Sequence, residues 1–413
     1  MEFRNHTLEN GLEIVAECSR SAYTSSLGFF VKTGARDETP EVAGVSHFLE
    51  HMLFKGTERR SAADVNRELD ELGSHANAYT SEDRMVYYAT VLPEYQQRAL
   101  DILADIMRPA LRTEDFETEK QVIIEEICKY EDQPPFGAHE KAMAAYFGEH
   151  PMGNNVLGSV ESVSALTADA MRGYFEKRYS PSNIVLAAAG NVDFDELCRQ
   201  AEGYCGDWEN HDADRQEPAL APRHGVEVIH KELATQEYLI QISAGPTTDD
   251  DDRYPMRMMS TIVGDDSGSR IYWELIETGL AEAAAIWPYD YQRVGLVMTY
   301  MACAPEQAAE NLQRLTEIQK QVEAEGVTEE ELQQAKAKVC ASIVLRAERP
   351  SSRMFSVGGG WIQRREYRTV KQAVERYRSV TVDEVNEALK KYPLSKNMTV
   401  AVGPLETLGM NGS

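Results

Sequence analysis

The sequence has neither a long apolar run nor an excess of positive charge. No segment of the 413 residues approaches the roughly eighteen apolar residues of a membrane-spanning helix. Lysine and arginine number 42 against 68 aspartates and glutamates, for a formal charge of −26, which argues against nucleic acid as a partner and would favour a basic peptide. The N-terminal stretch has the pattern of neither a signal peptide nor a transit peptide. We therefore expect a cytoplasmic protein without a membrane span.

Paired cysteine spacings are also missing. Cys198 and Cys205 are near enough in sequence for a disulfide, but in a chain with no export signal we expect reduced thiols. The six cysteines are scattered and show no Cys-x-x-Cys motif: Cys18, Cys128, Cys198, Cys205, Cys303 and Cys340. No chemistry is assigned to them.

Length and composition indicate a soluble globular protein of at least two domains. The hydrophobic fraction is 42% and the charged fraction 27%, both ordinary for soluble proteins. Single hydrophobic cores rarely grow beyond about 250 to 300 residues, so a chain of 413 residues should divide.

Residues 47–51 read His-x-x-Glu-His and are followed by an apolar stretch. On a helix, His47 and His51 lie one turn apart on the same face, so both imidazoles can bind one metal ion with Glu50 beside them. Two neutral imidazoles suit Zn²⁺, and a catalytic zinc keeps one position open for water. The order of residues is that of the inverzincin signature of zinc peptidases.

A third ligand is expected from a downstream acid, because two histidines leave a zinc site incomplete. Residues 113–130 predict a helix with an N-terminal threonine and acids in its first turn. Glu119 and Glu126 are two turns apart and project from one face of this helix, so both carboxylates can reach one site.

With these motifs the chain resembles the pitrilysin, insulysin and mitochondrial processing peptidase family, in its short, two-domain, processing-peptidase-like form. That family has the inverted motif followed some seventy-five residues later by a glutamate ligand on such a helix, and Glu126 lies 75 residues after His51. Further matches are found at 56–58, 75–92 and 150–163. The resemblance favours Glu126 over the neighbouring Glu125.

The resemblance implies a role for each of these residues. His47, His51 and Glu126 would hold one zinc ion per chain, which lowers the pKa of a bound water towards about 7. Glu50 would act as general base, passing the proton of the water to the leaving amine. Glu119 would hydrogen-bond a ligand or the water and so support the geometry of the site.

An internal repeat with an offset of about 214 residues indicates a duplication. Thr167-x-Asp169 begins a helical stretch followed by Asn183 and an apolar strand, and Thr381-x-Asp383 begins another that leads to Asn397. The helix predicted from residue 113 has a counterpart starting near residue 329. The positions that correspond to His47 and Glu126 at this offset are near Ile262 and Ala341. No matching histidine or glutamate occurs there. We expect the second copy to lack the metal.

The predicted fold class is α+β, with two homologous domains that each form an antiparallel sheet covered by helices. The predicted organisation is a catalytic zinc-binding domain at 1–205, a polar linker at 206–223 and a homologous inactive domain at 224–413. The resemblance adds that such domains are half-shells enclosing a chamber, and that these proteins pair. A homodimer, or a heterodimer with a homologous subunit, is therefore expected.

Periodicity and residue type predict the individual elements. Strands are expected at 11–17, 26–32, 84–91, 237–244 and 296–302. Helices are expected at 44–54, 62–72, 95–107, 113–130, 168–178, 306–325, 329–348 and 382–391. The glycine run 358–360 is interpreted as a flexible turn. Residues 76–80 should form a sheet edge near the metal where an extended substrate can add as a strand, with Asn77 and Tyr79 as candidate contacts.

The chain departs from the family pattern in its second half. The resemblance predicts an arginine and, some seven residues on, a tyrosine that position the substrate carbonyl. Ile276 stands where the arginine is expected and Glu282 near the tyrosine position. Isoleucine cannot donate a hydrogen bond, and ionised glutamate only accepts. Tyr289 or Tyr291 could substitute, or could serve packing alone.

Together these observations predict a zinc-dependent metalloendopeptidase that hydrolyses unfolded peptides or short polypeptides. The alternative is a non-catalytic or weakly active subunit that binds peptide for a homologous peptidase. The intact metal motif favours the enzyme, whereas the missing arginine and tyrosine favour the alternative. A metal-dependent hydrolase of a small non-peptide substrate is a third, weaker interpretation.

Overall fold

The computed structural model describes residues 1–409 in two compact units. The first unit contains residues 1–128, 154–216 and 345–368, and the second contains 129–153, 217–344 and the described residues from 369 onward. Each unit is therefore assembled from both halves of the sequence. The predicted domain boundaries at residues 205 and 224 divide the chain by its duplication and not by compact unit, and they remain a prediction.

The first unit is built on a six-stranded sheet with the order β1-β2-β6-β3-β5-β4. All neighbours are antiparallel except β2 and β6. Every residue of β3 is buried, as expected for a central strand covered on both faces. The strands are β1 (Glu2–Thr7), β2 (Glu13–Cys18), β3 (Ser25–Val31), β4 (His75–Thr80), β5 (Met85–Val91) and β6 (Ile184–Gly190).

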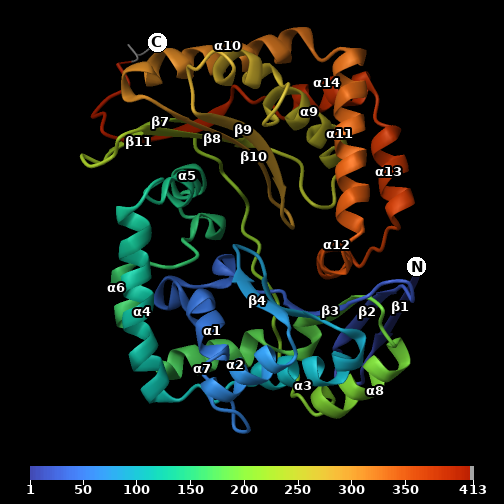
Figure 1. Ribbon diagram of the computed structural model, residues 1–413. Coiled ribbons are helices and arrows are strands. Elements are labelled where there is room, and N and C mark those ends of the chain that lie inside the picture. Colours follow the sequence, from blue (N-terminus) through green and yellow to red (C-terminus); the bar gives the residue numbers. More distant parts are fainter. Residues whose placement is uncertain (410–413) are drawn as a thin grey trace. The chain divides into compact units, whose positions relative to one another are not determined.

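Most helices of the first unit lie on one face of this sheet, as Figure 1 shows for α1, α2, α3 and α7. Phe48 of α1 stacks on Phe116 of α4, with ring centroids 4.7 Å apart, and both join the core with Leu27 and Phe29 of β3. The apolar face of α1 is thereby fixed. These helices are α1 (Val45–Leu53), α2 (Ala62–Glu71), α3 (Gln96–Ile106), α4 (Thr113–Asp132), α6 (Val160–Ala165), α7 (Ala168–Arg178) and α8 (Phe194–Cys205).

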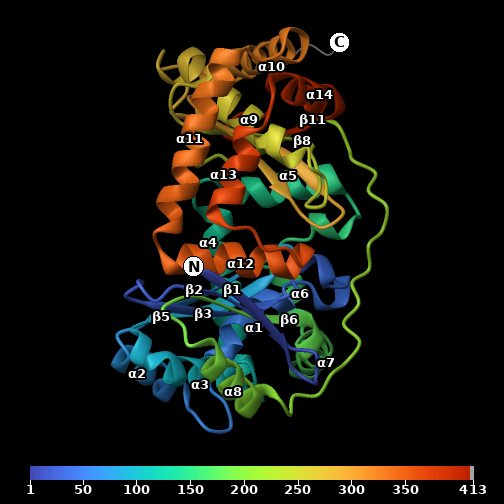
Figure 2. The same cartoon turned by 90° about the vertical axis from the view of Figure 1, so that its right-hand side faces the viewer.

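The opposite face is covered by α12 (Pro350–Arg364), seen above the sheet in Figure 2. The interpretation of 358–360 as a flexible turn is wrong, because all three glycines lie in this helix. A Cβ atom on Gly358 would lie 2.4 Å from Cε2 of Phe30 and 2.8 Å from Cβ of Ala187. Close packing against the sheet thus requires glycine and outweighs its low helix propensity.

The second unit repeats this plan with a five-stranded sheet of order β7-β11-β8-β10-β9. Again one pair, β7 and β11, is parallel. The first face is covered by helices that include α9, α10, α11 and α14, and the second face by α5, which packs on β8 and β11. The α+β class and the duplication are confirmed. In each unit the other half of the chain supplies the helix on the second face.

The elements of the second unit that the sequence predicts agree closely with the structure, whereas α5, β7, α9, β9 and α13 are not among the predicted ones. The predicted 237–244 and 382–391 match two elements at both ends, and the others differ by one or two residues. Its elements are α5 (Ala138–Phe147), β7 (Gly225–His230), β8 (Glu237–Ala244), α9 (Arg253–Gly264), the π-helix Tyr272–Ile276, β9 (Ala283–Asp290), β10 (Gly295–Cys303), α10 (Ala308–Glu325), α11 (Glu329–Ala347), α13 (Val370–Arg378), α14 (Val382–Lys391) and β11 (Asn397–Gly403). In residues 1–409 no helix is long and apolar enough to cross a bilayer.

We predict that Glu17→Gln weakens the attachment of α12 to the sheet of the first unit. The Arg353 guanidinium donates to both carboxylate oxygens of Glu17, at 2.8 and 2.5 Å, and both side chains are at least 92% buried. Leaving one buried charge unpaired should lower the free energy of unfolding by about 3 kcal/mol or more, measured by urea denaturation. The control is Glu13→Gln, whose partner Arg365 is 65% exposed, and should cost below about 1 kcal/mol. Equal losses would contradict the prediction.

Two neighbouring glycines in α12 should respond oppositely to alanine. Gly358→Ala is expected to lower stability by about 1–2 kcal/mol, because the added methyl group overlaps Phe30 and Ala187. At Gly359 the nearest atom to an added Cβ is Nη1 of Arg84, at 3.4 Å, so Gly359→Ala should be neutral or stabilising by up to about 1 kcal/mol. Thermal unfolding of the two variants would reveal the difference, and identical shifts would contradict it.

Candidate metal centre

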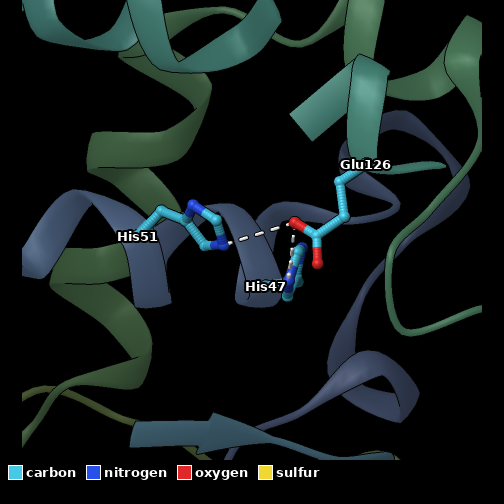
Figure 3. Close-up of side chains that lie close together, drawn as sticks. All are labelled: His47, His51 and Glu126. Carbon is cyan, nitrogen blue, oxygen red and sulfur yellow. Dashed lines mark ion pairs between the residues drawn. The ribbon is translucent and has the colours of Figure 1, made fainter. Parts of the chain in front are cut away.

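Three predicted ligands converge in the first unit. His47 and His51 project from one face of α1, and Glu126 reaches them from α4 (Figure 3). Oε2 of Glu126 lies 3.8 Å from Nε2 of His47 and 3.5 Å from Nε2 of His51. The three side chains can offer ligand atoms that all lie within 4.8 Å of one another. The helical spacing of the histidines accounts for this convergence.

The spacing and chemistry of these atoms fit a zinc ion. Zinc bonds of about 2.0–2.2 Å to nitrogen and oxygen place neighbouring ligand atoms of a tetrahedral site about 3.3–3.6 Å apart. The two distances from Glu126 are within a few tenths of an ångström of that range. Two imidazoles and one carboxylate form a typical catalytic zinc set with a fourth position free for water.

His47 is held in the neutral form that a metal requires. It is 8% exposed, and burial, followed by the proximity of His51, lowers the pKa of its imidazole to about 4. Its Nδ1 atom is buried without a hydrogen-bond partner among the described residues. Near neutral pH the imidazole is therefore unprotonated, and no proton competes with a metal cation for its ring nitrogen.

His51 is oriented by Glu119 and, through it, by Lys55. Nδ1 of His51 lies 2.8 Å from Oε1 of Glu119, and Nζ of Lys55 lies 2.5 Å from Oε2 of the same carboxylate. Burial acts to raise the pKa of Glu119, but the hydrogen bonds from Lys55 and His51 outweigh it, and the pKa is lowered. An ionised Glu119 accepts the Nδ1 proton of His51 and leaves Nε2 to face Glu126. Sequence reasoning missed Lys55, although its position four residues after His51 was a usable signal.

Glu50 faces the sheet edge. Oγ1 of Thr80, the last residue of β4, donates a hydrogen bond to Oε2 of Glu50 at 2.5 Å. Burial raises the pKa of Glu50, while this hydrogen bond and His51 act to lower it. A carboxylate with a raised pKa and a fixed orientation can accept and return a proton. Thr80 is a second residue that sequence reasoning did not single out.

The strand β4 is the outer strand of its sheet, as predicted. Asn77 is exposed, and its Oδ1 accepts a hydrogen bond from the backbone of Ala78. Tyr79 is 36% exposed and lies against Phe355 of α12, with ring centroids 6.1 Å apart. The outer edge of β4 thus has unpaired backbone groups next to Glu50. The substrate contacts of Asn77 and Tyr79 remain a prediction.

Residues 154–162 support the loop that leads into α1. Asn154 donates to the carbonyl oxygen of Ala35, and Ser162 to that of Ala43. Gly44 has a left-handed φ of 90°, and a Cβ atom there would lie 2.7 Å from the carbonyl oxygen of Leu157. Only glycine fits this position. This contact explains why part of the 150–163 motif accompanies the metal motif.

The departures from the family pattern lie in the second unit. Ile276 ends the π-helix and packs against the apolar core, and Glu282 accepts a hydrogen bond from Gln236. Tyr289 and Tyr291 stack on each other with centroids 6.3 Å apart, and Tyr291 is buried. Among residues 1–409 the group around His47 is the one cluster of at least three possible ligands. The described residues of the second copy contain no equivalent cluster, and the expectation that this copy lacks metal stays a prediction.

Comparison with known proteins identifies the class. Residues 13–160 match the family model for insulinase (peptidase family M16), and residues 165–339 match that for the M16 inactive domain. A protein of Mycobacterium bovis described as an uncharacterized zinc protease is 33% identical across 99% of this chain and 94% of its own length. Its counterpart in Bacillus subtilis is 29% identical across 93% and 94%. The chain belongs to peptidase family M16.

Solved structures share its fold. A protease from Helicobacter pylori superposes with a TM-score of 0.91 at 20% identity, covering 98% of this chain and 99% of its own. A peptidase M16 inactive domain protein from Pseudomonas fluorescens gives 0.91 at 18% identity, with 98% coverage of both chains.

The buried His47 predicts a pH-dependent stability of the metal-free protein. The imidazole titrates near 6.5 in the unfolded chain and near 4 in the folded one. Between these values the unfolded state binds more protons, so the free energy of unfolding falls as the pH decreases from 6.5 to 4, by up to about 3 kcal/mol. Denaturant titrations across this range should show the slope, and His47→Gln should flatten it. The exposed His6 is the control: His6→Gln should leave the slope in place, and a slope unchanged in His47→Gln would contradict the assignment.

Proposed function

We propose that this protein is a zinc-dependent endopeptidase. The observation that carries the proposal is the convergence of His47, His51 and Glu126 beside a carboxylate, Glu50, that Thr80 orients. The names of the relatives support zinc and proteolysis at the level of the family. When bound, zinc supplies a Lewis acid that makes water acidic enough to attack an amide near neutral pH.

Side chains of the protein transfer the proton and hold the ligands in place. Glu50 takes a proton from the attacking water and delivers it to the nitrogen of the leaving amine. Its raised pKa suits both halves of this transfer, because a more basic carboxylate accepts the proton of the water more readily and its acid form can return it. Glu119 and Lys55 hold the imidazole of His51 in place, so that the metal ligands need no rearrangement during turnover.

The substrate is proposed to be an unfolded peptide or short polypeptide that extends along β4. An extended chain can satisfy the unpaired backbone groups of this outer strand, and Asn77 and Tyr79 would contact its side chains. The net charge of −26 would attract a basic peptide, most strongly at low salt. Pairing with a second copy or with a homologous subunit is a further proposal, supported by the family resemblance.

A second candidate function is a peptide-binding subunit with little activity of its own. Ile276 and Glu282 favour it, because neither offers the hydrogen-bond donor that the family pattern provides. Ile276 is partly buried and packs against the apolar core, and Glu282 accepts a hydrogen bond from Gln236. Metal binding alone is compatible with both functions, so the decisive measurement is cleavage that depends on Glu50.

We predict that Glu50→Gln abolishes cleavage while zinc binding is retained. Glutamine keeps the shape of the side chain but cannot accept a proton from water, so turnover of a mixed peptide library should fall at least about 100-fold. Zinc content, measured by atomic absorption, should stay close to one ion per chain, because Glu50 is not among the three converging ligands.

Two neighbouring acids on α4 provide the controls. Glu126→Gln should lose zinc and activity together, whereas Glu125→Gln, which alters an exposed side chain, should change neither. Wild-type protein that binds zinc but shows no Glu50-dependent cleavage would reject the peptidase and support the second candidate. Loss of zinc in Glu125→Gln but not in Glu126→Gln would reject the ligand assignment.

A further inference from the structure

A buried acid outside the metal motif accepts hydrogen bonds from the N-terminus of α1, the helix that carries both histidines. Glu38 is 5% exposed and belongs to none of the segments that the sequence marks as functional. Its Oε2 accepts a hydrogen bond from the backbone N–H of Gly44, and its Oε1 accepts one from Ser46, both at 2.7 Å. One carboxylate therefore bridges two backbone groups at the N-terminus of α1.

The helix needs this partner because its own first residues provide none. The N-terminal N–H groups of any helix lack acceptors within the helix. In α1 the N-cap is Gly44, which has no side chain to offer, and the first turn contains no acid. Glu38 supplies the missing acceptors from six and eight residues upstream. Ser46, which it holds, directly precedes His47.

The loop that carries Glu38 is itself fixed by an adjacent buried acid. Asp37 forms an ion pair with Arg178 of α7 at 2.9 Å and accepts hydrogen bonds from Arg215, and all three side chains are at least 96% buried. Arg215 also donates to the carbonyl oxygen of Asp83. Glu38 therefore lies on a loop that the contacts of Asp37 fix independently of α1.

The same loop holds the turn that follows β4. The backbone N–H groups of Ala35 and Arg36 donate to the carbonyl oxygens of Ser81 and Glu82. That turn comes directly after Thr80, whose hydroxyl donates to Glu50. One short segment, 35–38, thus connects the two elements that meet at Glu50: the helix that carries the histidines and the strand that carries Thr80.

We propose that Glu38 is a positioning residue of the metal centre, which fixes the first turn of α1 so that His47 stays in register with Glu126 and Glu50 stays against Thr80. The inference rests on the proposed function in so far as it assumes that His47 binds metal. Because the contact lies at the N-terminal end of α1, its loss should displace His47 more than His51, which Glu119 holds separately.

The test compares metal binding by wild type, Glu38→Gln and Glu38→Ala. Glutamine keeps one acceptor oxygen and presents a donor to the second N–H group, whereas alanine removes both acceptors. We expect zinc affinity, measured by chelator competition, to fall about 10-fold or more in Glu38→Gln and further in Glu38→Ala, the range seen for supporting residues of zinc sites. With Co²⁺ as probe, the visible absorption band should shift. If Glu38→Ala does not fold, the zinc affinity of Glu38→Gln alone decides whether the proposal holds.

Glu17→Gln is the matched control, because it destabilises the same unit through a buried carboxylate whose hydrogen bonds come from Arg353 and Tyr367, outside α1. It should lose stability but keep wild-type zinc affinity and the wild-type Co²⁺ spectrum. Wild-type affinity in both Glu38 variants, or an equal loss of affinity in Glu17→Gln, would overturn the proposal and leave Glu38 a purely structural residue.

A second readout separates this inference from the proposed function. In metal-free protein the imidazole resonances of His47 should move in Glu38→Gln, whereas those of His51 should change little. Absence of zinc binding in the wild type would reject the peptidase, and the resonances alone would then decide: movement of His47 supports positioning by Glu38, and unchanged resonances overturn it.

Discussion

Two adjacent buried carboxylates, Asp37 and Glu38, impose the constraint on which the candidate site depends. A buried carboxylate is costly unless donors saturate its oxygens. Asp37 meets this demand with Arg178 and Arg215, whereas the first N–H groups of α1 meet it for Glu38 only in part, because burial still raises the pKa of Glu38 to about 8. Satisfying both acids at once leaves the 35–38 loop a single conformation. The positions of α1, which carries the candidate ligands, and of the turn after β4 depend on this loop.

The sequence predicts the parts of this site whose order is local. The spacing of His47 and His51 on α1, and of Glu119 and Glu126 on α4, follows from helical periodicity, and residues 76–80 lie at the sheet edge where they are expected. Thr80 and Glu38 act across the fold, so no periodicity marks them, whereas Lys55 lies one helical turn after His51 and could have been found. The glycine run of α12 shows the reverse error, since glycine indicates a turn locally, whereas packing against Phe30 and Ala187 makes it a requirement of the helix.

The second unit shows that fold and chemistry are specified by different residues. Its sheet and covering helices follow the plan of the first unit, which needs only apolar residues at the right period. In α9, which follows β8 in the chain as α1 follows β3, methionines and isoleucine occupy the buried face, and no histidine or acid occurs. Ile276 extends this apolar packing. The duplicated frame therefore survives without the side chains that make the first copy a candidate metal centre.

The exchange of covering helices between the two sequence halves has a consequence for how the chain can be divided. The sheet of the first unit has α12 on one face, and that of the second has α5, each supplied by the other half. A fragment ending in the 206–223 segment would expose Phe30, Val86 and Ala187 to water. Each fragment would lack the helix that covers the second face of its sheet. Two fragments produced together could each complete the other, which makes this segment a natural position for a split, self-complementing protein.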